Sequence, residues 1–129
     1  MILTDPRARP GTIRISGHAT LPDLLSRAAA RRGDAWALLD APNRERFTDG
    51  KPRRLSYRQA DRMVSAIAGR LRRMGLHTDD IVAIQMASTV ENVLTILGVL
   101  RAGLIPMPLP LLWRERRWWQ RSAASGQPR

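Results

Sequence analysis

The sequence predicts an α/β fold, in which an N-terminal helix, a small β-hairpin and an amphipathic helix precede a parallel βαβ unit. Three observations carry this prediction. Apolar residues recur at helical spacing over residues 56–75, the run 81–86 is almost continuously apolar and β-branched, and a second apolar helix and strand follow it directly. A strand, a helix and a strand with short connections are typical of a right-handed parallel βαβ unit.

The first helix is predicted to begin after Thr20, which is a good N-cap residue. Pro22 suits the first helical turn, and Asp23 lies three residues after the cap, where it completes a capping box. Gly33 is suited to end the helix. The apolar stripe consists of Leu21, Leu24, Leu25, Ala28 and Ala29.

A small hairpin is predicted next. The apolar run 36–41 is consistent with a strand. A second strand is expected around Phe47, with a turn at Asp49-Gly50 and a return strand near Leu55.

The amphipathic helix is expected between Ser56 as N-cap and Gly75 at its C-terminal end. The strand 81–86 then reads as buried on both faces, and Ser88 or Thr89 is expected to cap a helix over 90–101. Gly103 is expected to end that helix and to lead into a last strand. The apolar positions of the amphipathic helix are Tyr57, Ala60, Met63, Val64, Ile67, Ala68, Leu71 and Met74.

The composition is that of a globular protein of 129 residues, with 43% hydrophobic residues and a net charge of +11. The absence of cysteine excludes disulfides and thiolate metal sites and, together with the lack of a signal-peptide pattern, favours a cytoplasmic protein. Of the 22 basic residues only Lys51 is a lysine. Because the arginines are spread along the chain, a GC-rich coding sequence explains them better than a phosphate-binding surface does.

A membrane span over residues 93–113 is a weaker alternative. The segment is apolar, but Arg101 would lie near its middle. The second half would be broken by Pro106, Pro108 and Pro110.

No catalytic constellation is found, and we predict no catalytic, cofactor-binding or metal-ligating residue in this chain. His18 and His77 have no metal-ligand spacing, and Gly98 and Gly103 form neither a Rossmann nor a P-loop pattern. The pair Asp79-Asp80 is interpreted as the turn into a strand, where an aspartate accepts hydrogen bonds from nearby backbone.

Several motifs in order are similar to the N-terminal part of the adenylate-forming superfamily, the AMP-dependent synthetases and ligases that include acyl-CoA synthetases. The matching motifs are Leu55-Ser56-Tyr57, then Gly75-Leu76 with Asp80, Val82, Ala83 and Ile84, and then Leu100-Arg101-Ala102-Gly103 with Pro108. The sequence departs from the family pattern in three places. Ala60 replaces the usual leucine, Asp79 replaces a glycine, and Ala87-Ser88-Thr89 replaces the frequent Pro-Asn.

The resemblance implies an irregular lead-in over 1–19, part of the N-terminal subdomain of an AMP-binding ligase over 20–113, and a basic tail over 114–129. It implies that the parent enzyme joins a carboxylic acid to coenzyme A through an acyl-adenylate, as in fatty acid metabolism, with ATP and Mg²⁺ as cofactors. The ATP-binding loop and the catalytic residues of the family would lie beyond this sequence. We therefore expect a truncated fragment without activity of its own, whose exposed apolar surface leads to self-association.

The tail contains Arg114, Arg116, Arg117 and Arg121 around the pair Trp118-Trp119. One hypothesis is a shift of reading frame near Arg114, since the Trp codons read in another frame permit valines within an alanine-rich helix. The alternative is a small basic protein that binds nucleic acid or an anionic membrane through this Arg/Trp tail. We expect neither a specific nucleic-acid partner nor a membrane partner.

Overall fold

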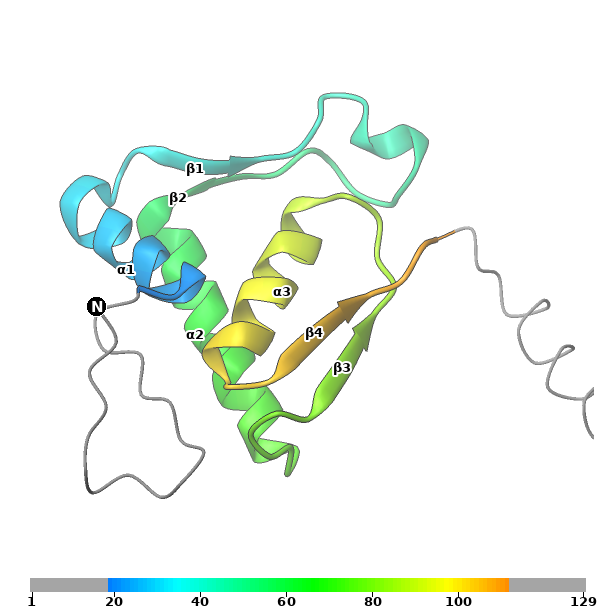
Figure 1. Ribbon diagram of the computed structural model, residues 1–129. Coiled ribbons are helices and arrows are strands. Elements are labelled where there is room, and N and C mark those ends of the chain that lie inside the picture. The colour runs from blue at the N-terminus through cyan, green and yellow to red at the C-terminus, as the bar shows by residue number, and fades with distance from the viewer. Residues whose placement is uncertain (1–18, 112–129) are drawn as a thin grey trace, which may run out of the picture.

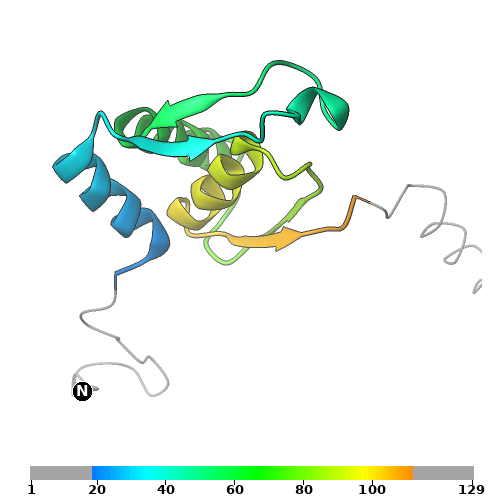
Figure 2. The same cartoon turned by 90° about the horizontal axis from the view of Figure 1, so that it is seen from above.

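The computed structural model describes residues 19–111 of the chain. Two helices, α2 (Tyr57–Arg73) and α3 (Val90–Arg101), lie between two small sheets (Figures 1 and 2). One sheet pairs β1 (Trp36–Leu39) with β2 (Arg54–Ser56), and the other pairs β3 (Ile81–Ile84) with β4 (Ile105–Pro108). Helix α1 (Leu21–Arg32) packs beside α2. The α/β fold class predicted from the sequence is confirmed.

Helix α1 begins as predicted. Thr20 is the N-cap, and its side chain accepts a hydrogen bond from the backbone N–H of Asp23 while the Asp23 carboxylate accepts from the N–H of Thr20. The prediction for Gly33 needs a different physical reason. Its φ of −52° is right-handed, so no left-handed cap is present. A Cβ at Gly33 would lie 2.8 Å from both the carbonyl oxygen of Ala29 and the guanidinium of Arg58, so glycine is needed for close approach.

An antiparallel pair of strands is present in this region, but it is not the hairpin that was predicted around Asp49-Gly50. The strand predicted around Phe47 is wrong, because residues Arg44–Arg46 form a 3-10 helix and Phe47 ends it. Strand β1 instead pairs antiparallel with β2, with Leu38 opposite Leu55. Gly50 has a left-handed φ of +83°, but it lies within the connection between β1 and β2 and does not join two adjacent strands as expected. The connection between β1 and β2 is held by the charged side chain of Arg44, which donates to the carbonyl of Asp49 and to Glu91. The pattern of apolar residues does not predict these contacts.

Helix α2 follows the prediction at both ends. Ser56 and Gln59 form a reciprocal capping box, and Gly75 takes a left-handed φ of +84° just after the helix. Its apolar face packs against α3. Gly98 of α3 sits directly over Ile67 of α2, where a Cβ would come within 2.8 Å of the Ile67 Cβ. The absence of a side chain at Gly98 therefore leaves the space that the Ile67 side chain occupies between the two helices. The core residues below 5% exposure are Ala60, Val64, Ala68, Ile84, Val90, Leu94, Val99 and Leu104.

The predicted βαβ unit is confirmed, since β3 and β4 are parallel with Ile81 opposite Ile105. Gly103 has a φ of +81° and ends α3 as expected. Burial on both faces is wrong for residues 19–111. Val82 and Ile84 pack towards α3, but the outer side chain of Ile81 is 63% exposed.

No helix in the described range is long and apolar enough to cross a membrane. The apolar stretch that was considered as a membrane span is divided between helix α3, which ends at Arg101, and strand β4.

Candidate functional site

Within residues 19–111, His77 and the pair Asp79-Asp80 form a turn and no metal cluster. The side chain of His77 is 89% exposed, and its Nδ1 lies 3.9 Å from Asp80 Oδ2. Asp80 Oδ2 accepts a 2.7 Å hydrogen bond from the backbone N–H of His77, which confirms the turn interpretation. No group of three or more His, Asp or Glu side chains within residues 19–111 could hold a metal ion. His18 lies outside the described residues.

Asp79 has an unusual backbone conformation in this turn. Its φ is +70°, in the left-handed region, where glycine is favoured. This is the position at which the resembling family carries glycine. Asp79 therefore adopts a backbone conformation that glycine adopts more easily. Its backbone N–H donates to the carbonyl of Gly103 at 2.9 Å.

The densest charged cluster lies at the N-terminus of α3 and was not found from the sequence. Arg44 donates two hydrogen bonds to Glu91, at 2.9 Å and 3.0 Å, and also contacts Asp40. Arg53 Nε lies 3.0 Å from Glu91 Oε1. We call Asp40, Arg44, Arg53 and Glu91 the α3 clamp. It joins the end of β1, the 3-10 helix, the segment before β2 and the first turn of α3.

Asp40 is the centre of the clamp, and its side chain is only 1% exposed. Its Oδ1 accepts a 2.8 Å hydrogen bond from the backbone N–H of Val90, and its Oδ2 accepts one of 2.8 Å from the N–H of Arg53. Thr89 occupies the N-cap position of α3 but makes no side-chain capping bond. Asp40 therefore caps α3 across 50 residues of sequence.

The electrostatics of the clamp follow from these contacts. Burial disfavours the charged form of Asp40, but hydrogen bonds from the backbone of Arg53 and Val90 and from Arg44 hold its pKa below the usual value. Hydrogen bonds from Arg44 likewise lower the pKa of Glu91, and those to Glu91 and Asp40 raise the pKa of Arg44. All three groups are thus held in their charged forms at neutral pH.

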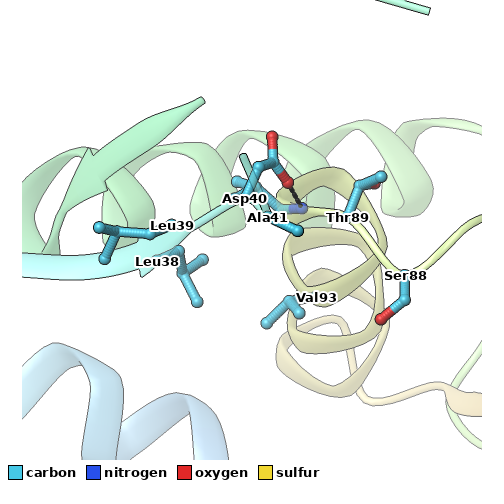
Figure 3. A pocket seen from close by; sticks show the side chains of 8 residues that line it. Leu38, Leu39, Asp40, Ala41, Ser88, Thr89 and Val93 are labelled. Carbon is cyan, nitrogen blue, oxygen red and sulfur yellow. Dashed lines mark hydrogen bonds between the residues drawn. The ribbon is translucent and has the colours of Figure 1, made fainter. Parts of the chain in front are cut away.

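A small pocket lies beside the clamp (Figure 3). Its volume is about 140 Å³, and Figure 3 shows Leu38 and Val93 on opposite sides, with Asp40 bonded to the backbone of α3. Ligand sites typically measure roughly 300–1,000 Å³. The carboxylate at this pocket is already occupied by backbone donors, so the arrangement serves the scaffold. The remaining lining residues are Leu39, Ala41, Ser88, Thr89 and Val90.

A second polar centre surrounds Arg101, a residue of the family-like motif. Its guanidinium donates to Asp61 Oδ1 at 2.7 Å, to Ser26 Oγ at 2.8 Å and to the carbonyl of Pro22 at 2.9 Å. It also donates to Ser65 Oγ at 2.8 Å. Burial raises the pKa of Asp61, but hydrogen bonds from Ser26 and Arg101 bring it below the usual value overall. Arg101 therefore ties α1, α2 and α3 together.

The glycines excluded as a phosphate loop have packing and turn roles, as described above for Gly98 and Gly103. The tail arginines and Trp118-Trp119 lie outside the described residues, so the frame-shift and binding interpretations remain predictions. In the sequence, Arg101 was singled out only because it belongs to the motif Leu100-Arg101-Ala102-Gly103. The α3 clamp had no signal in the sequence, because Arg44 and its partner Glu91 lie 47 residues apart.

Relatives among curated proteins are peptide synthetases. Tyrocidine synthase 1 from Brevibacillus parabrevis is 41% identical over 65 residues, which are 50% of this chain and 6% of that protein. The probable non-canonical nonribosomal peptide synthetase CymA from Salinispora arenicola is 32% identical over 98 residues, 76% of this chain and 1% of that protein. The chain spans between 1% and 7% of the length of these curated relatives.

Solved structures share the fold. The fatty acid AMP ligase from Legionella pneumophila superposes with a TM-score of 0.64 at 23% identity, over 84% of this chain and 18% of that one. The N-terminal subdomain of NpsA from Klebsiella oxytoca gives a TM-score of 0.61 at 26% identity, over 82% of this chain and 25% of that one. The sequence profile of the family described as AMP-binding enzyme matches residues 25–126. The chain belongs to the AMP-binding enzyme family of adenylate-forming ligases.

Proposed function

We propose that this chain supplies scaffold elements of a carboxylate-activating adenylation domain, of the kind found in nonribosomal peptide synthetases, and performs no adenylation alone. The observation that carries the proposal is the family match over residues 25–126. The polar side chains of the α3 clamp and of the Arg101 centre bond to one another and to the backbone. Their role in the larger domain is to fix the helices.

The reaction of the complete domain would join a carboxylate oxygen to the α-phosphorus of ATP and release pyrophosphate. ATP and Mg²⁺ would supply that activation, and none of the residues described above is assigned to them. The relatives favour an amino acid as the carboxylate and peptide assembly as the destination, in place of the coenzyme A ligation and fatty acid metabolism expected from the resemblance. A cytoplasmic location is part of the same proposal.

A segment exchange tests the scaffold role. The segment of tyrocidine synthase 1 that corresponds to residues 20–113 of this chain would be replaced by those residues, so that Ser26, Asp61 and Arg101 are transferred together. Amino-acid-dependent exchange of pyrophosphate into ATP would then be measured for the chimaera and for the isolated chain. We expect activity in the chimaera and none in the isolated chain.

The matched control is the same chimaera with Arg101→Leu, which removes the hydrogen bonds that join three helices. It should lose activity together with thermal stability. A folded but inactive chimaera would contradict the scaffold role, and pyrophosphate exchange by the isolated chain would contradict the assignment of chemistry to other segments.

The binding-protein alternative is tested separately. It predicts salt-sensitive affinity for nucleic acid or anionic vesicles that disappears when residues 114–129 are deleted. The scaffold proposal predicts that this deletion changes no specific affinity.

A further inference from the structure

The two edges of the β3–β4 sheet differ in their chemistry. The backbone N–H of Ile105 donates to the carbonyl of Asp80 at 2.9 Å, and that of Leu109 donates to Ile84 at 2.8 Å. Backbone direction alternates along a strand, so the groups of residues 105, 107 and 109 face β3 and those of 106, 108 and 110 face away. The outward positions are Pro106, Pro108 and Pro110.

Three prolines in alternation remove every N–H donor from the outer edge of β4. Proline has no backbone N–H and is confined to edge strands or to bulges. A strand that approached this edge would find carbonyl acceptors but no donors. The β4 edge therefore cannot be extended by a normal ladder of hydrogen bonds.

The outer edge of β3 has the opposite character. The carbonyls of Asp80 and Ile84 point towards β4, so the backbone groups of Ile81 and Ala83 point away from it. In the part of the chain that the structure describes, β3 has β4 as its only neighbouring strand. Ala83 is exposed, and so is Ile81. Figure 1 shows β3 at the margin of the molecule, beside β4.

We propose that two copies of this chain pair through their β3 edges, antiparallel about a two-fold axis normal to the sheet. The β3–β4 sheet of a second copy brings the same two edges. Since the β4 edge lacks donors, only the β3 edge of that sheet can supply both donors and acceptors. Identical edges related by a two-fold axis run antiparallel and form a closed, isologous contact. The strand order across the pair is β4-β3-β3-β4.

Pairing through β3 would place the exposed apolar face of the β3–β4 sheet at the contact between the two copies. Ile81, Ile105 and Met107 are 63%, 46% and 44% exposed on the outer face of the sheet. The two-fold axis keeps these side chains on one face, where those of β3 gain cross-strand neighbours from the second copy. The net charge of +11 opposes association, so added salt should strengthen the pair.

The proline pattern also limits the assembly to two copies. If both edges were open, β3 of one copy could pair with β4 of the next, and a head-to-tail contact of this kind continues indefinitely. With β4 blocked, the β3–β4 sheet of each copy has one usable edge. The prolines thus limit pairing through this sheet to two copies of the separate chain.

The test measures the mass of the full 129-residue chain by sedimentation equilibrium over a range of concentrations at two salt concentrations. We expect a monomer–dimer equilibrium that shifts towards dimer at higher salt. Ala83→Pro removes one outward N–H from each copy and none from the β3–β4 ladder. It should raise the dissociation constant by about tenfold or more. Ile105→Thr, which lowers the apolarity of the face and leaves both edges intact, is the matched control and should have a smaller effect.

A second variant tests the role of the prolines by a gain of assembly. Pro106→Val combined with Pro108→Val restores donors to the β4 edge and should convert the dimer into larger polymers, seen as a rising and open-ended mass distribution. Three results of the mass measurements overturn the proposal. These are a monomer at all concentrations, a dimer that Ala83→Pro leaves unchanged while Ile105→Thr dissociates it, and a double proline variant that remains a dimer. Hydrogen exchange that shows protected amides at Ile81 and Ala83 in a monomer would identify an intramolecular strand as the occupant and would also overturn it.

Discussion

The contact between Gly98 and Ile67 gives a prediction that can be worked out from the structure. A methyl group at position 98 would lie 2.8 Å from the Cβ of Ile67, closer than carbon atoms approach in proteins. Gly98→Ala must therefore move α3 away from α2 or force Ile67 from its rotamer. Overpacking of this kind costs about 1–3 kcal/mol, whereas the higher helix propensity of alanine returns about 1 kcal/mol. We expect a net loss of up to about 2 kcal/mol in the free energy of unfolding.

The double variant Gly98→Ala with Ile67→Ala provides the decisive comparison. Removing the Ile67 side chain costs stability alone, but it also creates the space that the new methyl group needs. The loss in the double variant should therefore be smaller than the sum of the two single losses, by about 1 kcal/mol or more. The assay is urea unfolding followed by circular dichroism for all four proteins. If the two effects add to within about 0.5 kcal/mol, the close helix contact does not exist and the reasoning is refuted.

Three further predictions concern the turn at Asp79, the Arg101 centre and the α3 clamp. At Asp79, whose φ is +70°, stability should rank Gly above Asn and Asp, and these above Val, over a range of about 1–2 kcal/mol in thermal unfolding, and a stable Val variant would contradict the left-handed backbone. Arg101→Ala should cost about 2–4 kcal/mol because it leaves Asp61 without its cation, whereas Arg101→Lys should recover part of the loss, and equal losses in both variants would contradict the hydrogen-bond geometry. Because the folded-state pKa values of Asp40 and Glu91 are lowered, their contribution to stability is present above the unfolded values and is lost as the pH falls through the folded ones, so the free energy of unfolding should decline below about pH 5. The Asp40→Asn variant should have a lower free energy of unfolding than the unmodified protein at pH 7, and its free energy of unfolding should fall less steeply below about pH 5. An unchanged pH profile in this variant would contradict the role of Asp40.

Local signals predicted most of the helices and the parallel pair of strands. Capping residues such as Thr20 and Ser56 act within three positions of sequence, and the structure confirms both boxes. The failures involve distant contacts. Phenylalanine is common in strands, which is why a strand was predicted around Phe47. The segment before Phe47 instead folds as a 3-10 helix that contains Arg44, and Arg44 donates hydrogen bonds to Glu91. No local pattern contains the partner of such a contact.

The order of the motifs indicated the family, while the physical roles of the motif residues came from the structure. Arg101 matched a motif position, yet its bonds to Ser26 and Asp61 depend on how three helices meet. Asp79 departed from the motif, and the positive φ explains why glycine suits that position. The α3 clamp could not be predicted, because buried carboxylates are recognised only once their donors are known.

The cap that Asp40 provides to α3 has a consequence for the order in which the protein folds. A helix capped by its own neighbour can form early, since closing a short loop costs little conformational entropy. Helix α3 takes its cap from a residue 50 positions away, so its first turn is secured only after the chain has closed that long loop. The β3–α3–β4 segment is therefore not an independent folding unit, although its topology is local. Its first helical turn becomes stable only when the end of β1 has arrived, which couples the two sheets into one cooperative transition.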